Sequence, residues 1–184
     1  LVVAGAGSGK TRVLTQRIAH LIQEDNINPF QILAITFTNK AAQEMKDRVA
    51  ALVGPVAEKM WVSTFHSACV RILRRDAEQL GYPSAFSIYD QADATRLTGY
   101  VVRDLGLDNK KFVARSVHAQ ISNLKNELIS TDAALDRADG IFGRKIAEIY
   151  DEYQQRLRSA GAIDFDDLLT VTVQLFDNFP NALS

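Results

Sequence analysis

The sequence is poor in cysteine, and it has neither a long apolar run nor an excess of charge of one sign. Its 184 residues include a single cysteine, Cys69, which excludes an internal disulfide and a metal site built from several cysteines. No run reaches the roughly 20 apolar residues that a membrane-spanning helix needs. The 21 lysines and arginines nearly balance 22 aspartates and glutamates, so any nucleic acid must be bound by local patches and stacking surfaces.

What remains is the composition of an ordinary globular protein. Hydrophobic residues make up 47% and charged residues 23%, which is typical of soluble domains with a core of their own. A chain of this length forms one large domain, or one domain with a smaller insert. The lone cysteine favours a reducing compartment, and we expect a cytoplasmic protein. Because the first residue is Leu1, already inside an apolar run, we also expect the chain to be a fragment.

The most informative stretch is rich in glycine and lies between the apolar run Leu1-Val2-Val3 and the amphipathic run Arg12–Gln23. A strand, a glycine-rich turn and a helix that opens with Gly-Lys-Thr are typical of a phosphate-binding loop. Glycines let successive N–H groups turn around an anion, and the helix dipole favours negative charge at that end. The predicted ATP-binding residues are Ala4, Gly5, Ala6, Gly7, Ser8, Gly9, Lys10, Thr11 and Arg12.

Two of these residues have predicted catalytic roles. Lys10 is expected to reach the β- and γ-phosphates, and the Thr11 hydroxyl is expected to bind the Mg²⁺ that bridges them. The pattern G-x-x-x-x-G-K-[ST] has glycine where this chain has Ala4. The alternative is a glycine-rich turn that binds nothing.

Apolar runs alternate with helical stripes over the first 85 residues. Strands are predicted at Leu1–Val3, Ile32–Ile35 and Trp61–Phe65, and the continuous apolar character of the second favours a strand buried on both faces. The order βαβαβα predicts an α/β fold with a parallel sheet. The buried helical stripes are predicted to be Val13, Leu14, Ile18, Leu21 and Ile22; Ala41, Ala42, Met45, Val49 and Leu52; and Phe65, Ala68, Cys69, Ile72, Leu73, Ala77 and Leu80.

The pattern changes at about Asp90, and no strand-like segment separates the helical stripes that follow. Asp90 with Asp93 indicates a helix start, and Asp164 is predicted to cap a last helix that runs toward Phe176. The predicted stripes are Leu97, Tyr100, Val101 and Leu105; Val113, Val117, Ile121, Leu124 and Leu128; and Ile146, Ile149, Tyr150, Tyr153 and Leu157. The sequence therefore predicts an α/β part over residues 1–85, a helical subdomain over 86–160 and a return over 161–184.

Two polar turns with an aromatic residue follow the second and third predicted strands. Ligands of parallel sheets bind at the carboxyl ends of strands, so both turns should lie on the rim that carries the phosphate loop. Aromatic rings offer stacking faces to bases, and hydroxyl, amide and ammonium groups offer donors to phosphates. The predicted single-strand contacts are Thr36, Phe37, Thr38, Asn39 and Lys40 in one turn and Thr64, Phe65 and His66 in the other. The alternatives are a core position for Phe37 and a capping or packing role for His66.

Four motifs in this order resemble those of the UvrD/PcrA/Rep family of superfamily 1 DNA helicases: A-G-A-G-S-G-K-T, I-T-F-T-N-K-A-A-Q-E-M, S-T-F-H-S and D-F-D-D-L-L. The likeness covers essentially the whole chain. It implies a RecA-like, P-loop NTPase motor domain interrupted by an all-helical subdomain that touches duplex DNA. It also implies an ATP- and Mg²⁺-dependent enzyme that moves 3′ to 5′ on single-stranded DNA, acts at single/double-strand junctions and works with repair or replication proteins.

The resemblance also assigns residues. Gly5 to Thr11 correspond to the ATP and Mg²⁺ site, Phe37 to the base-stacking ring, and Asp164 to Leu169 to a motif that rejoins the motor domain. Asp164 has the simpler alternative of a helix cap. Asp151-Glu152-Tyr153-Gln154-Gln155 imitates the family's D-E-x-Q-D motif, but we expect it to be a decoy because it lies within a helical stripe and not at a strand end.

Four basic residues of the helical subdomain, Lys110, Lys111, Arg115 and Lys125, could form a duplex-contacting face or simply a solvated helix surface. Three other functions stay open. A phosphate-loop kinase or metabolic ATPase explains the glycine-rich loop but gives the polar turns no role. The second open function is a non-catalytic nucleotide-binding module. The third is the helicase subunit of a helicase-nuclease.

Overall fold

The computed structural model describes residues 9–183. The chain divides into two compact units, Leu1–Ala68 and Cys69–Ser184, and helix α3 (Phe65–Asp76) passes from one to the other. In the described residues 9–183, no helix has the length and apolar character needed to cross a membrane.

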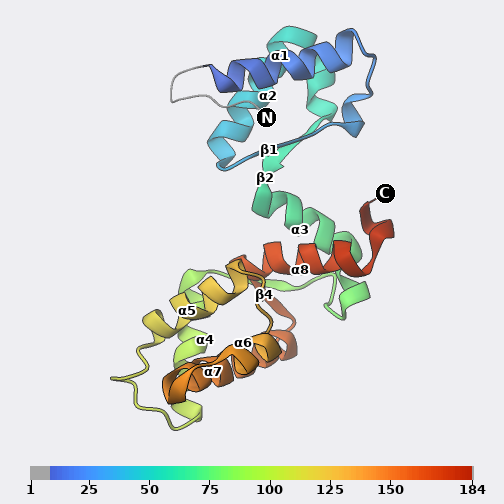
Figure 1. The fold of residues 1–184 in the computed structure, drawn as a ribbon. Coiled ribbons are helices and arrows are strands. Elements are labelled where there is room, and N and C mark those ends of the chain that lie inside the picture. The colour runs from blue at the N-terminus through green and yellow to red at the C-terminus, as the bar shows by residue number, and fades with distance from the viewer. Residues whose placement is uncertain (1–8, 184) are drawn as a thin grey trace. The chain divides into compact units, whose positions relative to one another are not determined.

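The first unit is a small α/β layer (Figure 1). Helices α1 and α2 pack against each other, and the two strands pair in parallel, with Thr36 opposite Thr64 at the end of the ladder. The predicted parallel pairing of these strands is confirmed. The elements of this unit are α1 (Lys10–Gln23), η1 (Pro29–Gln31), β1 (Leu33–Thr36), α2 (Asn39–Val53), η2 (Pro55–Lys59) and β2 (Trp61–Thr64).

Burial in this unit differs from the prediction. Val13 and Leu14 are 55% and 53% exposed, because the face of α1 that is buried carries Thr15, Ile18 and Ala19 instead. The prediction that the second strand is buried on both faces is also wrong, since Leu33 is 47% exposed. In the described part of the chain this strand has one strand neighbour, β2, and only part of its surface is covered.

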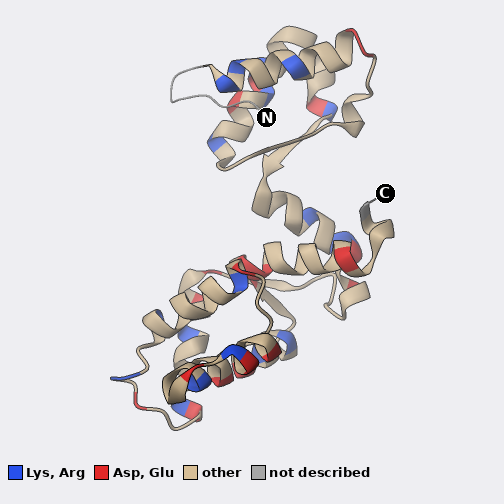
Figure 2. Ribbon diagram, viewed as in Figure 1, with Lys and Arg blue, Asp and Glu red and all other residues tan. Residues whose placement is uncertain are grey.

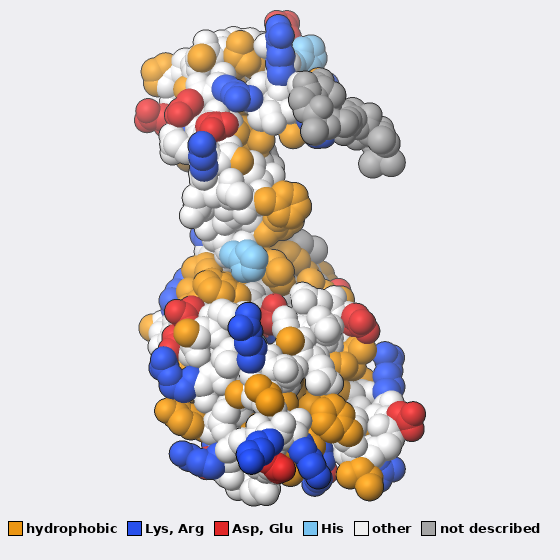
Figure 3. All heavy atoms as spheres, turned by 90° about the vertical axis from the view of Figure 1, so that its left-hand side faces the viewer, with side chains coloured by type: hydrophobic (Ala, Val, Ile, Leu, Met, Phe, Trp, Pro, Cys, Tyr) orange, Lys and Arg blue, Asp and Glu red, His pale blue; other side chains and the backbone are white. Residues whose placement is uncertain are grey.

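The second unit is mainly helical. In Figure 2, basic and acidic residues are interspersed along α7, which is typical of a helix with a solvated face. Figure 3 likewise shows a face on which apolar, basic and acidic side chains are mixed, with no field of a single sign. Beyond α3, the elements are η3 (Ala77–Leu80), β3 (Ser87–Tyr89), α4 (Gln91–Asp104), α5 (Ala114–Asn126), α6 (Thr131–Arg137), α7 (Gly140–Ser159), β4 (Ala162–Asp164), α8 (Phe165–Asn178) and η4 (Pro180–Leu183).

Several predictions for this unit are confirmed. The Asp90 side chain accepts from the N–H groups of Ala92 and Asp93 and so caps α4. The stripe on α7 is buried as expected and forms much of the core: Ile146, Ile149, Tyr150, Tyr153 and Leu157. Asp151 and Glu152 lie in the middle of this helix, as the decoy interpretation requires.

Other predictions are wrong. The region after Phe86 contains the strand β3, which pairs in parallel with β4; strands of three residues are too short to show an alternating pattern. The short helix α6 was not predicted. Besides Val13 and Leu14, six positions assigned to buried stripes are 40% exposed or more because they lie at element ends or beside the stripe: Leu52, Phe65, Tyr100, Leu105, Val113 and Leu128.

A buried ion cluster joins α5 to the start of α8. Lys125 is 1% exposed, and its Nζ lies 2.6 Å from Oδ2 of Asp164 and 2.9 Å from Oδ2 of Asp167. Tyr153 donates its hydroxyl to Asp164 over 2.6 Å, and the Asp164 side chain also accepts from the Asp167 N–H. Lys125 is therefore not a surface residue, and Asp164 does more than cap a helix.

The cluster sets the charge states of its members. Burial alone would raise the pKa of Asp164, but the Lys125 charge and hydrogen bonds from Lys125, Tyr153 and the Asp167 N–H lower it below its usual range. Burial raises the pKa of Asp167 although Lys125 opposes it, and the neighbouring Asp164 carboxylate adds to the rise. Burial disfavours the charged form of Lys125, but the two carboxylates outweigh it and raise the pKa.

We expect Lys125→Met to destabilise the chain strongly. Methionine keeps most of the buried stem but removes the ammonium, and Asp164 and Asp167 are left as neighbouring carboxyls without their cation. Breaking a buried pair in this way typically costs about 3–5 kcal/mol of unfolding free energy, which urea denaturation would measure. The matched control is Lys110→Met, at an exposed position, with an expected change within about 0.5 kcal/mol. A loss below about 1 kcal/mol for Lys125→Met would contradict this account.

Candidate nucleotide and nucleic-acid interface

The parallel register of β1 and β2 brings the two aromatic turns together. Because Thr36 pairs with Thr64, Phe37 and Phe65 leave the same edge of the ladder one residue later. Their ring centroids lie 5.6 Å apart with an interplanar angle of 48°. Phe37 is 90% exposed and Phe65 is 43% exposed. The sequence placed both turns on one rim, and the contact between the two rings agrees with that placement.

Local hydrogen bonds hold the first turn. The Thr38 hydroxyl accepts from the Ala41 N–H over 3.1 Å and caps α2, while the Thr36 hydroxyl donates to the Thr38 carbonyl over 3.0 Å. The connection between β1 and α2 consists of Phe37 and Thr38 alone, because α2 begins at Asn39. So short a connection cannot fold the Phe37 side chain back into the core. Asn39 and Lys40 are exposed in the first turn of α2. Phe37 is thus a surface residue in this chain, and the alternative that it occupies a core position is wrong.

The second turn uses its polar groups differently. Thr64 is 8% exposed, and its hydroxyl donates to the Ser67 hydroxyl over 2.9 Å and accepts from the Ser67 N–H over 3.3 Å. That hydroxyl is committed to the start of α3. Phe65 and His66 lie exposed beside it. The rim therefore presents the two rings, His66, Asn39 and Lys40, whereas Thr36, Thr38 and Thr64 hold the turns in place.

The N-terminal end of α1, which directly follows the predicted phosphate loop in the sequence, has the features of an anion site. Gly9 is the N-cap residue, with a left-handed φ of 83° that favours glycine. No side chain caps the helix there, and its first turn carries no acidic residue. Lys10, Thr11 and Arg12 are exposed in that first turn. Backbone donors at a helix N-terminus and two cations suit a phosphate group.

The remaining residues predicted for this loop, Ala4, Gly5, Ala6, Gly7 and Ser8, lie outside the described residues. In the part of the chain that is described, no group of three or more histidine, cysteine, aspartate or glutamate residues is arranged to hold a metal ion.

The imitation of the D-E-x-Q-D motif is accounted for by contacts within α7. The Gln155 amide donates to Asp151 over 2.7 Å, and the Arg156 guanidinium donates to Glu152 over 2.7 Å. Both carboxylates are half-buried on a helix of the second unit.

One feature that the sequence analysis missed is a pocket among α5, α6 and α7. No local sequence pattern predicts this pocket, because its walls come from three separate helices. Gly143, in the first turns of α7, was the one available signal, since glycine is unfavourable within a helix.

A parallel α/β unit whose helix start suits an anion and whose strand ends carry two exposed rings has the arrangement in which parallel-sheet proteins generally bind ligands at one edge of the sheet. The model of the UvrD/REP helicase N-terminal domain matches residues 1–184, and the chain belongs to that family.

Named relatives agree. The chain is 49% identical over 183 residues to the ATP-dependent DNA helicase PcrA of Bacillus subtilis, covering 100% of this chain and 25% of that protein. It is 56% identical over 185 residues to the ATP-dependent DNA helicase UvrD1 of Mycobacterium bovis, covering 98% of this chain and 24% of the relative. A PcrA of Staphylococcus aureus is 50% identical over 183 residues. The chain thus spans about a quarter of the length of the relatives that it matches.

We expect Phe37→Ala to leave folding nearly intact. The exposed ring contributes one tilted aromatic contact, with Phe65, worth at most about 1.5 kcal/mol. Thermal or urea denaturation checks this value. The matched control is Phe86→Ala, at a position 1% exposed, for which a loss of about 3–5 kcal/mol is expected. If the two substitutions destabilised the chain equally, Phe37 would be a core residue after all.

Proposed function

We propose that the intact protein is an ATP-dependent DNA helicase that moves 3′ to 5′ on single-stranded DNA and serves DNA repair or replication. The family and the names of the relatives support this activity. In this proposal residues 1–85 and 161–184 belong to a RecA-like motor domain, and residues 86–160 form a helical subdomain inserted into it. The protein acts in the cytoplasm, at the nucleoid when bound to DNA.

The observation that carries the proposal is the exposed pair Phe37 and Phe65. A ring that is 90% exposed at a strand end is poorly used as packing, but it serves as a platform on which a base stacks. Lys40 and Asn39 follow it in the first turn of α2 and offer donors to the adjoining phosphates. A kinase or a metabolic ATPase has no use for such a rim.

ATP is proposed to bind at the start of α1. Gly9 lets the backbone turn, the N-terminal N–H groups of α1 face the phosphates, and Lys10 offsets charge on the β- and γ-phosphates. The exposed Thr11 hydroxyl suits a hard cation such as Mg²⁺, which would neutralise phosphate charge when bound. The predicted contacts from Ala4 to Ser8 remain part of this proposal.

The helical unit is proposed to contact the duplex near a single/double-strand junction. Lys110, Lys111 and Arg115 are exposed close together in sequence, before and within the first turn of α5. Lys125 does not belong to this face, because it is buried in the ion cluster.

The DNA-binding role predicts a specific loss of affinity. In the intact protein, Phe37→Ala should weaken binding of single-stranded DNA by about 1–3 kcal/mol, the usual effect of removing an aromatic platform. Fluorescence anisotropy with labelled oligonucleotides measures it, and the loss should be similar for oligonucleotides of different base sequence. Phe30→Ala is the matched control, because Phe30 is also exposed but lies away from both turns. Equal affinity of the Phe37→Ala and parent proteins would refute the stacking role.

The nucleotide role predicts a loss of turnover. Lys10→Ala in the intact protein should reduce DNA-stimulated ATP hydrolysis by a factor of about 10² or more, because Lys10 stabilises charge that develops on the γ-phosphate. Phosphate release measures it, and Arg17→Ala, at an exposed position about two turns further along α1, is the control. If the Lys10→Ala protein hydrolysed ATP within about threefold of the parent rate, the proposed role of Lys10 at the γ-phosphate would be wrong.

A further inference from the structure

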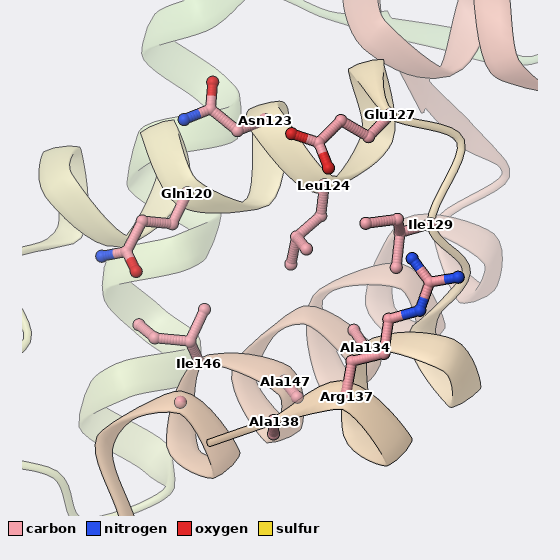
Figure 4. Close-up of a pocket in the computed structure, with 11 residues that line it drawn as sticks. Gln120, Asn123, Leu124, Glu127, Ile129, Ala134, Arg137, Ala138, Ile146 and Ala147 are labelled. Carbon is pink, nitrogen blue, oxygen red and sulfur yellow. The ribbon is translucent and has the colours of Figure 1, made fainter. Parts of the chain in front are cut away.

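A pocket of about 300 Å³ opens on the helical unit among α5, α6 and α7 (Figure 4). This volume lies at the lower end of the range for pockets that bind small ligands or anchoring side chains. The pocket lies in the second unit, whereas the nucleotide and aromatic sites lie in the first.

The interior of the pocket is apolar. Ile146 and Ala147 of α7 form part of its wall and are 4% and 2% exposed, and half-buried Leu124 and Ile129 lie across from them. Figure 4 shows the Leu124 side chain pointing into the space between α5 and α7. Such walls suit a large apolar side chain, which would leave water on entering.

Two opposite charges line the same pocket. Glu127 closes α5 as its C-cap residue, and Arg137 lies in the last turn of α6. Both are exposed, and in the described part of the chain no ion pair joins either side chain to a partner. Two opposite charges at the edge of an apolar space are complementary to an apolar group that has a basic and an acidic neighbour.

The wall also contains a glycine that packing does not require. Gly143 lies in the first turns of α7, where glycine is less favourable than alanine. A Cβ at this position would meet no atom nearer than 3.8 Å, at the Ala138 backbone, and no positive φ demands glycine. The absence of a side chain here leaves the pocket open.

We propose that this pocket docks a peptide segment of a partner protein in which one large apolar side chain lies between a basic and an acidic residue. The apolar side chain inserts between Leu124 and Ile146, the basic residue faces Glu127, and the acidic residue faces Arg137. Exposed charges beside a buried anchor are the usual arrangement of a protein interface, with an apolar centre and a polar rim. The inference does not depend on the proposed helicase activity.

The test measures binding of labelled, capped peptides to the full-length protein by fluorescence anisotropy. One probe contains the sequence Lys-Phe-Asp. A second probe contains Asp-Phe-Lys, because the pocket accepts the same three side chains from a peptide that runs in either direction. Replacing phenylalanine by alanine should weaken binding by about tenfold or more, since burying that ring is worth this much. Arg137→Glu should weaken binding of the better probe by about two- to fivefold, and a Lys-Phe-Lys peptide should recover the loss.

Gly143→Leu supplies a blocking variant. The new side chain should fill the pocket and abolish binding while leaving the melting temperature unchanged or raised, because leucine favours the helix. Arg144→Leu is its control, adding the same side chain at the next, exposed position that does not line the pocket. DNA-stimulated ATP hydrolysis should be unaffected in both variants, which separates this site from the proposed motor. Failure of both Phe probes to bind, or equal binding by the Gly143→Leu and parent proteins, would overturn the proposal.

Discussion

Parallel pairing of β1 with β2 is the constraint on which the functional rim depends. The register that sets Thr36 against Thr64 ends both strands at the same level, and a helix begins within three residues of each end. The capping hydroxyls of Thr38 and Thr64 are used up by those helix starts. Phe37, between β1 and α2, and Phe65, the first residue of α3, are consequently left on the outside, in contact with each other. Their exposure follows from hydrogen bonding in the backbone, and it does not require any ligand to be present.

Much of this rim could be predicted from the sequence, because its signals are local. An apolar strand that ends in threonine and is followed by an amphipathic helix shows where each turn lies. Because the strands are parallel, the turns that follow them lie at the same edge of the sheet. The caps at Asp90 and Asp164 were predictable for the same reason. Burial was less predictable, as Val13 and Leu14 show: periodicity reveals that a helix has an apolar face but not which neighbour will cover it.

The buried ion cluster of Lys125, Asp164 and Asp167 could not be predicted from the sequence. Lysine is almost never fully buried, and the partners of Lys125 come 39 and 42 residues later in the chain, so neither composition nor spacing links them. The same holds for the pocket among α5, α6 and α7, whose walls exist only once three helices have packed. Both features belong to the helical unit, in which the sequence predicted most of the helices but not α6, and could not predict how the helices pack against one another.

The pairing of β3 with β4 has an architectural consequence. Ser87 lies opposite Ala162, and the Ser87 N–H donates to the Gly161 carbonyl over 2.9 Å, so the helical segment between them leaves and re-enters at neighbouring points. A segment attached in this way can lengthen, shorten or exchange its helices without moving its two points of attachment, as domain insertions do elsewhere. The three-residue ladder thus holds both ends of the helical segment at one place, so this segment can diverge in sequence and length while the rest of the chain stays the same.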